Sequence, residues 1–244
     1  MPRFFVNTED VGKEFVYIKG SDAYHIARSL RMAVGDEITL SDGKGREFLC
    51  ELTKIRDEEC ECRITESRVS GAEMPLEVTL YMAYPKGDKL ETVIQKAVEL
   101  GASRIVPFES SRCIKRPKAE KLDKQLSRLQ RIAEEAAKQC GRGKLPEVLP
   151  PISFSVAISE AAKADISLFC YESEDKRSLR AALDKRKDAA SISVVVGSEG
   201  GFSPEEAAAA ISAGCVSVSL GRRILRCETA PSFVLSVISY VFEL

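Results

Sequence analysis

The stretch of sequence that decides the fold is ISVVVGSEGGFSPEEAAAAISAGCVSVSLG, residues 192–221. An apolar run leads into a glycine-rich turn, an alanine-rich helical pattern follows, and a second β-branched run closes the stretch. Ser203-Pro204-Glu205-Glu206 has the spacing of a capping box with proline at the first helical position, and Gly214 marks the end of that helix. Strand, helix and strand in this order are typical of a βαβ unit in a parallel sheet.

The same alternation continues on both sides of this stretch and defines a domain over residues 75–244. Asp88 and Glu91 have capping-box spacing at the start of a helix that Gly101 ends. We therefore expect an α/β domain whose mainly parallel sheet is covered by helices on both faces. Strands are predicted at 77–84, 104–108, 166–172, 192–197 and 215–221, and helices at 88–101, 118–139, 155–164, 178–187, 203–214 and 229–244.

Residues 1–70 have a different pattern and predict a separate domain. Short runs with β-branched and aromatic residues follow one another closely, and Asp42-Gly43 with Gly45 indicates a hairpin turn. One helical stretch, residues 22–32, interrupts the strands. This spacing favours a small β-barrel or sandwich. Residues 67–75 are the candidate linker, because regular periodicity stops there and Gly and Pro appear.

Composition excludes several classes of function. The 244 residues carry 36 Lys and Arg, 37 Asp and Glu, and a single histidine, His25. A zinc site built on several histidines is therefore excluded, and any Ser-His or Cys-His mechanism would have to use His25. The eight cysteines form no Cys-x-x-Cys, so we expect reduced thiols and no metal. Without a signal-peptide pattern or an apolar run of about 18 residues, the chain is expected to be cytoplasmic, with no membrane partner.

Three predicted strand ends carry residues suited to a binding site, because ligands of open α/β sheets lie beyond the carboxyl ends of the strands. We call residues 197–202 the glycine loop and residues 220–230, LGRRILRCETA, the arginine loop. The third end carries Cys170, Tyr171 and Glu172. Two plainer interpretations stay open: a tight turn before a helix, and an ion pair of an arginine with Glu228. Neither G-x-G-x-x-G nor a P-loop motif occurs.

Residues 112–144 form a basic segment with eleven Lys and Arg against four Asp and Glu. Because the whole chain has a net charge of −1, the remaining residues are acidic on balance. A solvated helix face is the ordinary explanation of such a segment. A nucleic-acid phosphate backbone would also favour it, although no aromatic residues for base stacking are interleaved.

Taken together, these motifs resemble one family. GSEGGFSPEE, LGRRILRCETA, YPKGDKLETVIQKAVELGASRIVPF, EEAAKQCGRGKLPEV and HIARSLRMAVGDEITLSDGKG occur in the order found in the bacterial 16S rRNA uridine-N3 methyltransferases of the SPOUT superfamily. The sequence departs from the family pattern at Ser198, where proline is usual, and at Ser29, where an aliphatic residue is common. Neither change removes a charge or a donor that the chemistry needs, and Ser198 makes the loop slightly less rigid.

The resemblance implies a PUA-like β-barrel, then a SPOUT α/β domain with a deep trefoil knot that dimerises with a second copy. It implies binding of S-adenosyl-L-methionine and action in the cytoplasm on 16S rRNA, within the assembled or assembling small subunit. The predicted cofactor-binding residues are Cys170, Tyr171, Glu172, Gly197, Ser198, Glu199, Gly200, Gly201, Leu220, Gly221, Ile224, Leu225, Arg226, Thr229 and Ala230. The predicted RNA-binding residues are Arg3, His25, Arg28, Arg31, Lys86 and Arg142.

Methyl transfer from a sulfonium needs alignment of the nucleophile, the methyl group and sulfur, and it needs neither a metal nor a redox group. Uridine N3 must also lose its proton. Arg223 and Arg226 are therefore predicted to stabilise the developing anion, with Glu228 as a catalytic carboxylate that orients an arginine or acts as base, and Glu199 as the rival base. Two alternatives stay open: a related enzyme that acts on tRNA or 23S rRNA, and a non-catalytic RNA-binding protein of the same fold.

Overall fold

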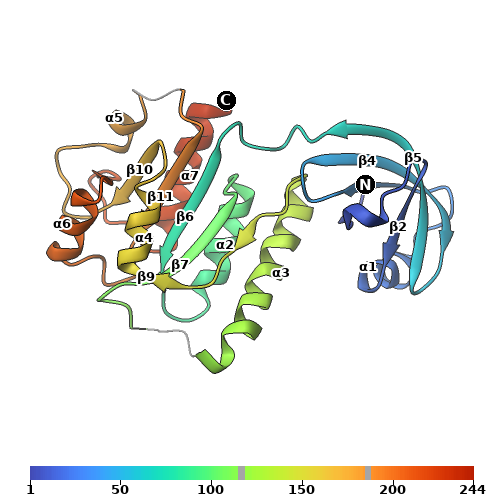
Figure 1. Cartoon of the computed structure of the whole chain (residues 1–244), viewed down its shortest axis with the longest axis horizontal. Coiled ribbons are helices and arrows are strands. Elements are labelled where there is room, and N and C mark those ends of the chain that lie inside the picture. Colours follow the sequence, from blue (N-terminus) through green and yellow to red (C-terminus); the bar gives the residue numbers. More distant parts are fainter. Residues whose placement is uncertain (115–118, 185–187) are drawn as a thin grey trace. The chain divides into compact units, whose positions relative to one another are not determined.

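The computed structural model describes residues 1–114, 119–184 and 188–244. The chain forms two compact units, Met1–Glu73 with Ala137–Leu145, and Met74–Ala136 with Pro146–Leu244 (Figure 1). The sequence pattern did not indicate that residues 137–145 belong with the first unit. Residues 115–118 of the basic segment and 185–187 of the helix predicted at 178–187 lie outside the described residues.

The N-terminal unit is a curved sheet in the strand order β1-β3-β4-β5-β2. β1 runs parallel to β3, and the other neighbours are antiparallel. The long strands β4 and β5 pair with register shifts after Leu49 and Leu52, and such bulges bend a sheet. Figure 1 shows both strands curving together. The strand bounds are β1 Arg3–Phe5, β2 Phe15–Lys19, β3 Glu37–Ser41, β4 Arg46–Ile55 and β5 Glu59–Val69.

Alternation along these strands builds the core of this unit. On β2, Val16 and Ile18 are buried while Lys19 is exposed, as expected for a sheet with one face in the core. The predicted hairpin turn is confirmed, with Gly43 at φ 70° and Gly45 at φ 104°. The predicted helical stretch forms α1, Ser21–Tyr24, and a π-helical turn, His25–Ser29.

The eight cysteines are all free, and every one except Cys140 is buried. Burial raises the pKa of the Cys50, Cys62 and Cys170 thiols to about 12. Protonated thiols in an apolar core are poor nucleophiles and poor metal ligands, so these three residues fill space.

The C-terminal unit contains a parallel sheet in the order β12-β10-β11-β6-β7-β8, with β9 paired to β7. Every pair within its described residues is parallel, which confirms the predicted sheet. β10 and β11 are almost continuously buried, as strands with helices on both faces must be. The bounds are β6 Glu77–Ala83, β7 Arg104–Glu109, β8 Glu147–Val148, β9 Ile152–Ser153, β10 Ile166–Cys170, β11 Ser191–Val196 and β12 Val216–Val218.

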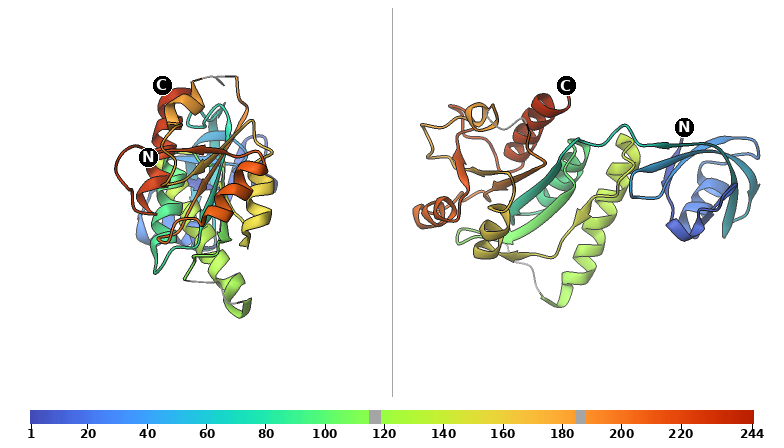
Figure 2. Two further views of the ribbon diagram at one scale, coloured as in Figure 1. Left: turned by 90° about the vertical axis from the view of Figure 1, so that its left-hand side faces the viewer. Right: turned by 45° about the horizontal axis from the view of Figure 1, so that its top comes forward.

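Helices cover both faces of this sheet. Figure 2 (left) shows α2 and α7 on one side and α4 and α6 on the other. The buried positions of α2 follow the predicted i, i+3, i+4 pattern, from Leu90 and Val93 to Ala97 and Val98. The helix bounds are α2 Lys89–Glu99, α3 Leu122–Cys140, α4 Phe154–Ala161, α5 Leu179–Leu183, α6 Pro204–Ser212 and α7 Thr229–Phe242.

One of the two predicted capping boxes is present. The Ser203 hydroxyl accepts from Glu206 N at 3.2 Å, and the Glu206 carboxylate accepts from Ser203 N at 2.9 Å. The box predicted at Asp88 and Glu91 was wrong, because Asp88 makes no side-chain cap and has φ −102° and ψ 12° instead of an extended conformation. Glu91 instead forms an ion pair with Arg128 at 2.9 Å.

Candidate functional site

A cavity of about 590 Å³ lies at the carboxyl ends of β10, β11 and β12. The three segments singled out in the sequence all line it, because the carboxyl ends of parallel neighbours meet at one edge of the sheet. Of the predicted cofactor-binding residues, Thr229 does not line it. The lining includes Cys170, Tyr171, Glu172, Gly197, Ser198, Glu199, Gly200, Gly201, Leu220, Gly221, Ile224, Leu225, Arg226 and Ala230, and also Val196, Ser219, Arg222, Arg223, Cys227 and Lys89.

The glycine loop has no room for side chains at its centre. A Cβ atom on Gly201 would collide with the Glu172 carboxylate, and φ there is 62°. A Cβ atom on Gly200 would lie 2.9 Å from Cβ of Arg112. Glycine accommodates the positive φ at residue 201 and the close approach of Arg112 to residue 200. Both the turn and the cavity shape therefore need glycine at these positions.

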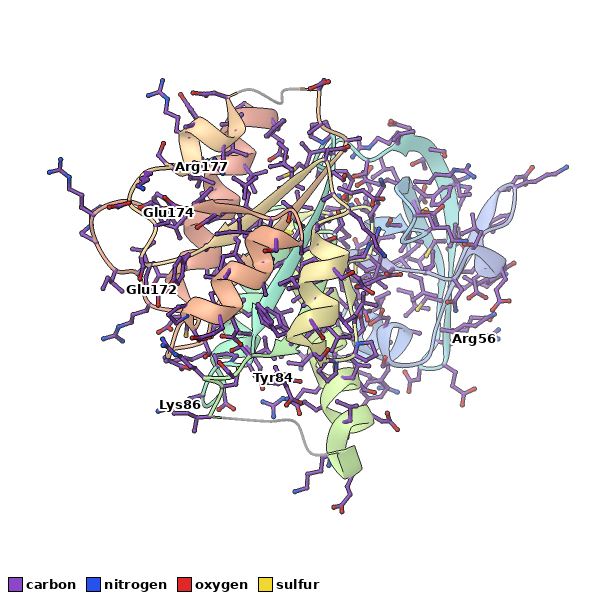
Figure 3. All side chains as sticks on the ribbon, turned by 60° about the vertical axis from the view of Figure 1, so that its left-hand side comes forward. Arg56, Tyr84, Lys86, Glu172, Glu174 and Arg177 are labelled. Atoms are coloured by element: carbon purple, nitrogen blue, oxygen red, sulfur yellow. The ribbon has the colours of Figure 1, made fainter. Side chains whose placement is uncertain are left out.

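Neighbouring connections hold the glycine loop in place. Arg112 Nη1 donates to the Gly200 carbonyl at 3.1 Å, which anchors the loop to the segment after β7. The Glu199 carboxylate accepts from Lys86 N at 3.1 and 3.2 Å, which anchors it to the segment after β6. Figure 3 shows Lys86 in that segment and Glu172 in the segment after β10. The loop is therefore fixed before any ligand binds.

Two polar side chains at the cavity have no protein partner within the described residues. Ser198 is 6% exposed and its hydroxyl makes no hydrogen bond. Glu172 makes no side-chain hydrogen bond or ion pair with any residue that the structure describes. A buried polar group without a partner is unfavourable, so the Ser198 hydroxyl is suited to a polar group of a ligand. Glu172 is exposed at the mouth of the cavity, where its carboxylate is available to hydroxyl or amino groups of the same ligand.

The arginine loop presents its cations to the cavity without pairing them. Arg222, Arg223 and Arg226 are exposed, and none of the three forms an ion pair with a described residue. The alternative in which an arginine pairs with Glu228 is therefore contradicted. Glu228 pairs with Lys89 at 3.2 Å instead, and does not line the cavity. Cationic groups without protein partners are available to an anionic or electron-rich ligand.

Lys89 is a cavity residue that the sequence analysis missed. Its Nζ lies 3.0 Å from Glu199 Oε1 and 3.2 Å from Glu228 Oε2. The Cys227 thiol also donates to Glu228 Oε2, at 3.2 Å. The available signal was its place just after a predicted strand end. The pairing itself depends on β6 lying beside β11, which the order of strands along the chain does not reveal.

These contacts keep the cluster ionised. Burial opposes ionisation of Glu199 and Glu228, but hydrogen bonds from backbone N–H groups and from Lys89 outweigh it and lower both pKa values. Hydrogen bonds to Glu199 and Glu228 raise the pKa of Lys89. Burial and the neighbouring Glu228 raise the pKa of Cys227 to about 12. Neither carboxylate is therefore tuned toward the neutral pKa that a general base needs.

The residues predicted to contact RNA have varied environments. His25 and Arg31 are exposed on the N-terminal unit, and Lys86 is exposed on the C-terminal unit. Arg28 is exposed and forms two hydrogen bonds with Asp57, at 2.9 and 2.6 Å. Arg3 is partly buried and forms an ion pair with the buried Glu47.

The environment of Arg142 contradicts its predicted contact with RNA. The residue is 3% exposed, and its guanidinium donates to Glu73 Oε2 at 2.9 and 3.3 Å. The other Glu73 oxygen accepts from the backbone N–H groups of Gly143 and Lys144. The ion pair therefore joins the return segment 137–145 to the end of the linker.

Replacing Arg142 with alanine is expected to lower the free energy of unfolding by about 3 kcal/mol, because it leaves the Glu73 carboxylate buried without its cation. Urea unfolding measures the effect. Arg128→Ala is the matched control: its ion pair with Glu91 is exposed on the arginine side, so a change within about 0.5 kcal/mol is expected. Equal effects of the two substitutions would contradict the structural role of Arg142.

Within the described ranges, no group of three or more His, Cys, Asp or Glu residues is placed to hold a metal ion. No helix in the described part of the chain is both long and apolar enough to cross a membrane.

Residues 72–239 match the family model of the RNA methyltransferase domain, and residues 18–65 match that of the RNA methyltransferase PUA domain. The chain belongs to the RNA methyltransferase family. The family resemblance drawn from the sequence is thereby confirmed, as is the fold class of an N-terminal PUA-like domain followed by an α/β methyltransferase domain.

Individual members of the family are similar over almost the whole chain. The ribosomal RNA small subunit methyltransferase E of Bacillus subtilis is 35% identical over 93% of this chain and 90% of its own length. The enzyme of that name from Neisseria gonorrhoeae, in a crystal structure bound to S-adenosyl methionine, is 32% identical with a TM-score of 0.88, over 99% of this chain and 98% of that one. A putative methyltransferase from Legionella pneumophila, in complex with the same cofactor, is 30% identical with a TM-score of 0.86, over 98% and 96%.

Proposed function

We propose that this protein transfers a methyl group from S-adenosyl-L-methionine to N3 of a uridine in 16S rRNA. The observation that carries the proposal is the cavity at the carboxyl edge of the sheet, in a chain of the RNA methyltransferase family. The fixed backbone of the glycine loop meets there with polar groups and arginines that have no partner among the described residues.

The residues present fit this cofactor. Ser198 and Glu172 offer an unpartnered hydroxyl and carboxylate for its polar groups, and the glycine loop and the apolar side chains of Leu220 and Leu225 line the same space. A carboxylate also complements the positive charge of a sulfonium ligand. When bound, the cofactor supplies an electrophilic methyl group.

The catalytic contribution of the chain is electrostatic. As N3 of a uracil loses its proton, negative charge spreads onto the ring carbonyls. We assign Arg223 and Arg226 to that charge, because both line the cavity and neither is neutralised by a described side chain. For Glu228, the lowered pKa, the contact with Lys89 and a position outside the cavity lining argue against proton abstraction and favour the role of an orienting carboxylate. A lowered pKa and a contact with Lys89 argue against Glu199 as the base as well.

Between about pH 6 and pH 9, the rate of methyl transfer is expected to rise with pH without an inflection from these groups. Glu199 and Glu228 have folded-state pKa values below 4.5, so their ionised form is stabilising above that pH and is lost only as pH falls through the lowered values. Lys89 has a pKa above 10.5 and loses its contribution only as pH rises through it. The rate of methyl transfer measured against pH under single-turnover conditions tests this expectation. A bell-shaped profile that Glu228→Gln flattens would show that Glu228 is the base.

We propose that the first unit, predicted from the sequence as residues 1–70, is the RNA-binding domain. The second, predicted as residues 75–244 and lacking residues 137–145 in the structure, is the proposed methyltransferase domain. The exposed His25, Arg28 and Arg31 and the basic segment 112–144, apart from the buried Arg142, supply hydrogen-bond donors and positive charge for RNA phosphates. An rRNA substrate within the small ribosomal subunit implies that the enzyme works in the cytoplasm. The deep trefoil knot of the C-terminal domain stays a prediction from the resemblance.

A homodimer is part of the proposal. Phe233 and Tyr240 on α7 are 40% and 73% exposed, and a spacing of seven residues places them on one face of the helix. The arginine loop adds Ile224, which is 88% exposed. Apolar side chains that gather on one helix and the loop before it support packing against a second copy.

Transfer of labelled methyl groups tests the function. Purified protein is incubated with labelled S-adenosyl-L-methionine and, in separate reactions, with small ribosomal subunits, naked 16S rRNA, naked 23S rRNA and tRNA. Label in 16S rRNA is expected. Label only in tRNA or in 23S rRNA would identify a related enzyme with another substrate, and no label in any RNA would favour a non-catalytic RNA-binding protein.

A further inference from the structure

Lys89 lies at a helix position where a positive charge is unfavourable. It is the first residue of α2, where the helix dipole is positive and a cation is destabilising. Its ammonium is offset by two carboxylates that come from other parts of the chain, Glu199 at 3.0 Å and Glu228 at 3.2 Å. Neither carboxylate belongs to α2, so the cluster does not serve to stabilise that helix alone.

The two carboxylates belong to two different loops that both contribute residues to the cavity wall. Glu199 lies in the glycine loop after β11, and Glu228 lies in the arginine loop just before α7. Because both are bound to one ammonium, they lie close together and would repel each other without it. All three side chains are partly buried, with 35%, 27% and 23% exposure for Lys89, Glu199 and Glu228, which weakens solvent screening.

The arginine loop has few other side-chain attachments. Arg222, Arg223 and Arg226 form no ion pair within the described part of the chain. Lys89 on α2 contacts this loop twice, through its ion pair with Glu228 at 3.2 Å and through a weaker contact of its ammonium with the Cys227 sulfur at 4.0 Å. α2 and α7 also pack against each other, so Lys89 acts at the point where both helices begin.

We propose that Lys89 is a positioning residue that joins the arginine loop to the glycine loop and thereby sets the shape of the cofactor cavity. The inference rests on the proposed function, since it concerns the same cavity. It assigns Glu199 and Glu228 to a structural ion-pair cluster. In this proposal Lys89 positions the two loops. It does not itself contact the cofactor, although its place in the cavity wall would allow such a contact.

The test compares full-length Lys89→Met, Lys89→Arg and the double variant Lys89→Met/Glu228→Gln. Affinity for S-adenosyl-L-methionine is measured by titration calorimetry. We expect Lys89→Met to weaken binding by about tenfold, because the two carboxylates then repel, and the double variant to regain most of that loss. Lys89→Arg is expected to stay within about threefold of the wild type, because it keeps the cation. Lys96→Met is the control, since Lys96 lies on the same helix in an ion pair with Glu99.

A second measurement does not depend on the cofactor. The exposed arginines of the arginine loop are trypsin sites, so limited digestion followed by mass spectrometry reports how firmly the loop is held. Cleavage after Arg222, Arg223 or Arg226 is expected to be about tenfold faster in Lys89→Met than in the wild type and in Lys96→Met.

Unchanged cleavage in Lys89→Met would overturn the proposal. A double variant that binds the cofactor as weakly as Lys89→Met would also overturn it and would identify Lys89 as a direct ligand. Failure of the wild type to bind the cofactor would contradict the proposed function instead. In that case the digestion experiment still decides the role of Lys89.

Discussion

Replacement of Arg226 with alanine is expected to slow methyl transfer by about a hundredfold or more while affinity for S-adenosyl-L-methionine stays within about tenfold. Arg226 lines the cavity, and its guanidinium forms no ion pair with a described residue, so its charge is available to the reacting base. Loss of a group that stabilises charge only in the transition state lowers kcat by about a hundredfold to a thousandfold. Single-turnover transfer and titration calorimetry measure the two quantities separately.

The control for Arg226→Ala is Arg180→Ala on α5, where the side chain is 89% exposed and forms an ion pair with Asp184 at 3.6 Å. It is expected to leave turnover unchanged. Loss of the folded state in Arg226→Ala, seen by circular dichroism, would show that the arginine is structural. An unchanged rate of methyl transfer in Arg226→Ala would mean that Arg223, and not Arg226, stabilises the anion.

Replacement of Gly201 with alanine is expected to weaken cofactor binding by about a hundredfold or more. A side chain at φ 62° is strained, and this one would collide with the Glu172 carboxylate, which we assign to the cofactor. The Glu172 side chain must turn away to relieve the collision, which removes its carboxylate from the cofactor, and the strained backbone at residue 201 adds to the loss. Calorimetry with the folded variant measures the loss.

Gly71→Ala is the matched control for this substitution, because a Cβ atom there has nothing within 4 Å. It is expected to bind the cofactor normally. If Gly201→Ala also bound the cofactor normally, the cavity described here would not be the cofactor site.

Much of the site could be predicted because its residues are contiguous in the sequence. The glycine loop and the arginine loop each follow a strand directly, and parallel strands bring their carboxyl ends to one edge. Pattern alone therefore located most of the cavity wall. The same contiguity explains why the capping box at Ser203 and Glu206 was predicted correctly, since both partners lie within one turn.

What could not be predicted depends on which distant segments become neighbours. Lys89 meets Glu199 only because β6 lies beside β11, although more than a hundred residues separate them. Arg142 was assigned to RNA from its place in a basic segment, whereas the return of residues 137–145 to the first unit buries it against Glu73. Charge along a sequence does not distinguish a solvated cation from a buried, paired one.

Asp88 shows a different limit of prediction from sequence. Its spacing to Glu91 satisfies the capping-box pattern, yet the observed backbone angles and the pairing of Glu91 with Arg128 exclude it. Local propensity was overridden by a contact with another helix, α3.

The most direct test of the account is the chemical identity of the methylated nucleoside. 16S rRNA from small subunits treated with the protein and S-adenosyl-L-methionine is digested to nucleosides and analysed by mass spectrometry against synthetic standards. We expect 3-methyluridine with the wild type and at least about a hundredfold less of it with Arg226→Ala after the same short reaction time. Methylation of a ribose hydroxyl or of another base, or 3-methyluridine in equal amount with Arg226→Ala, would contradict the account.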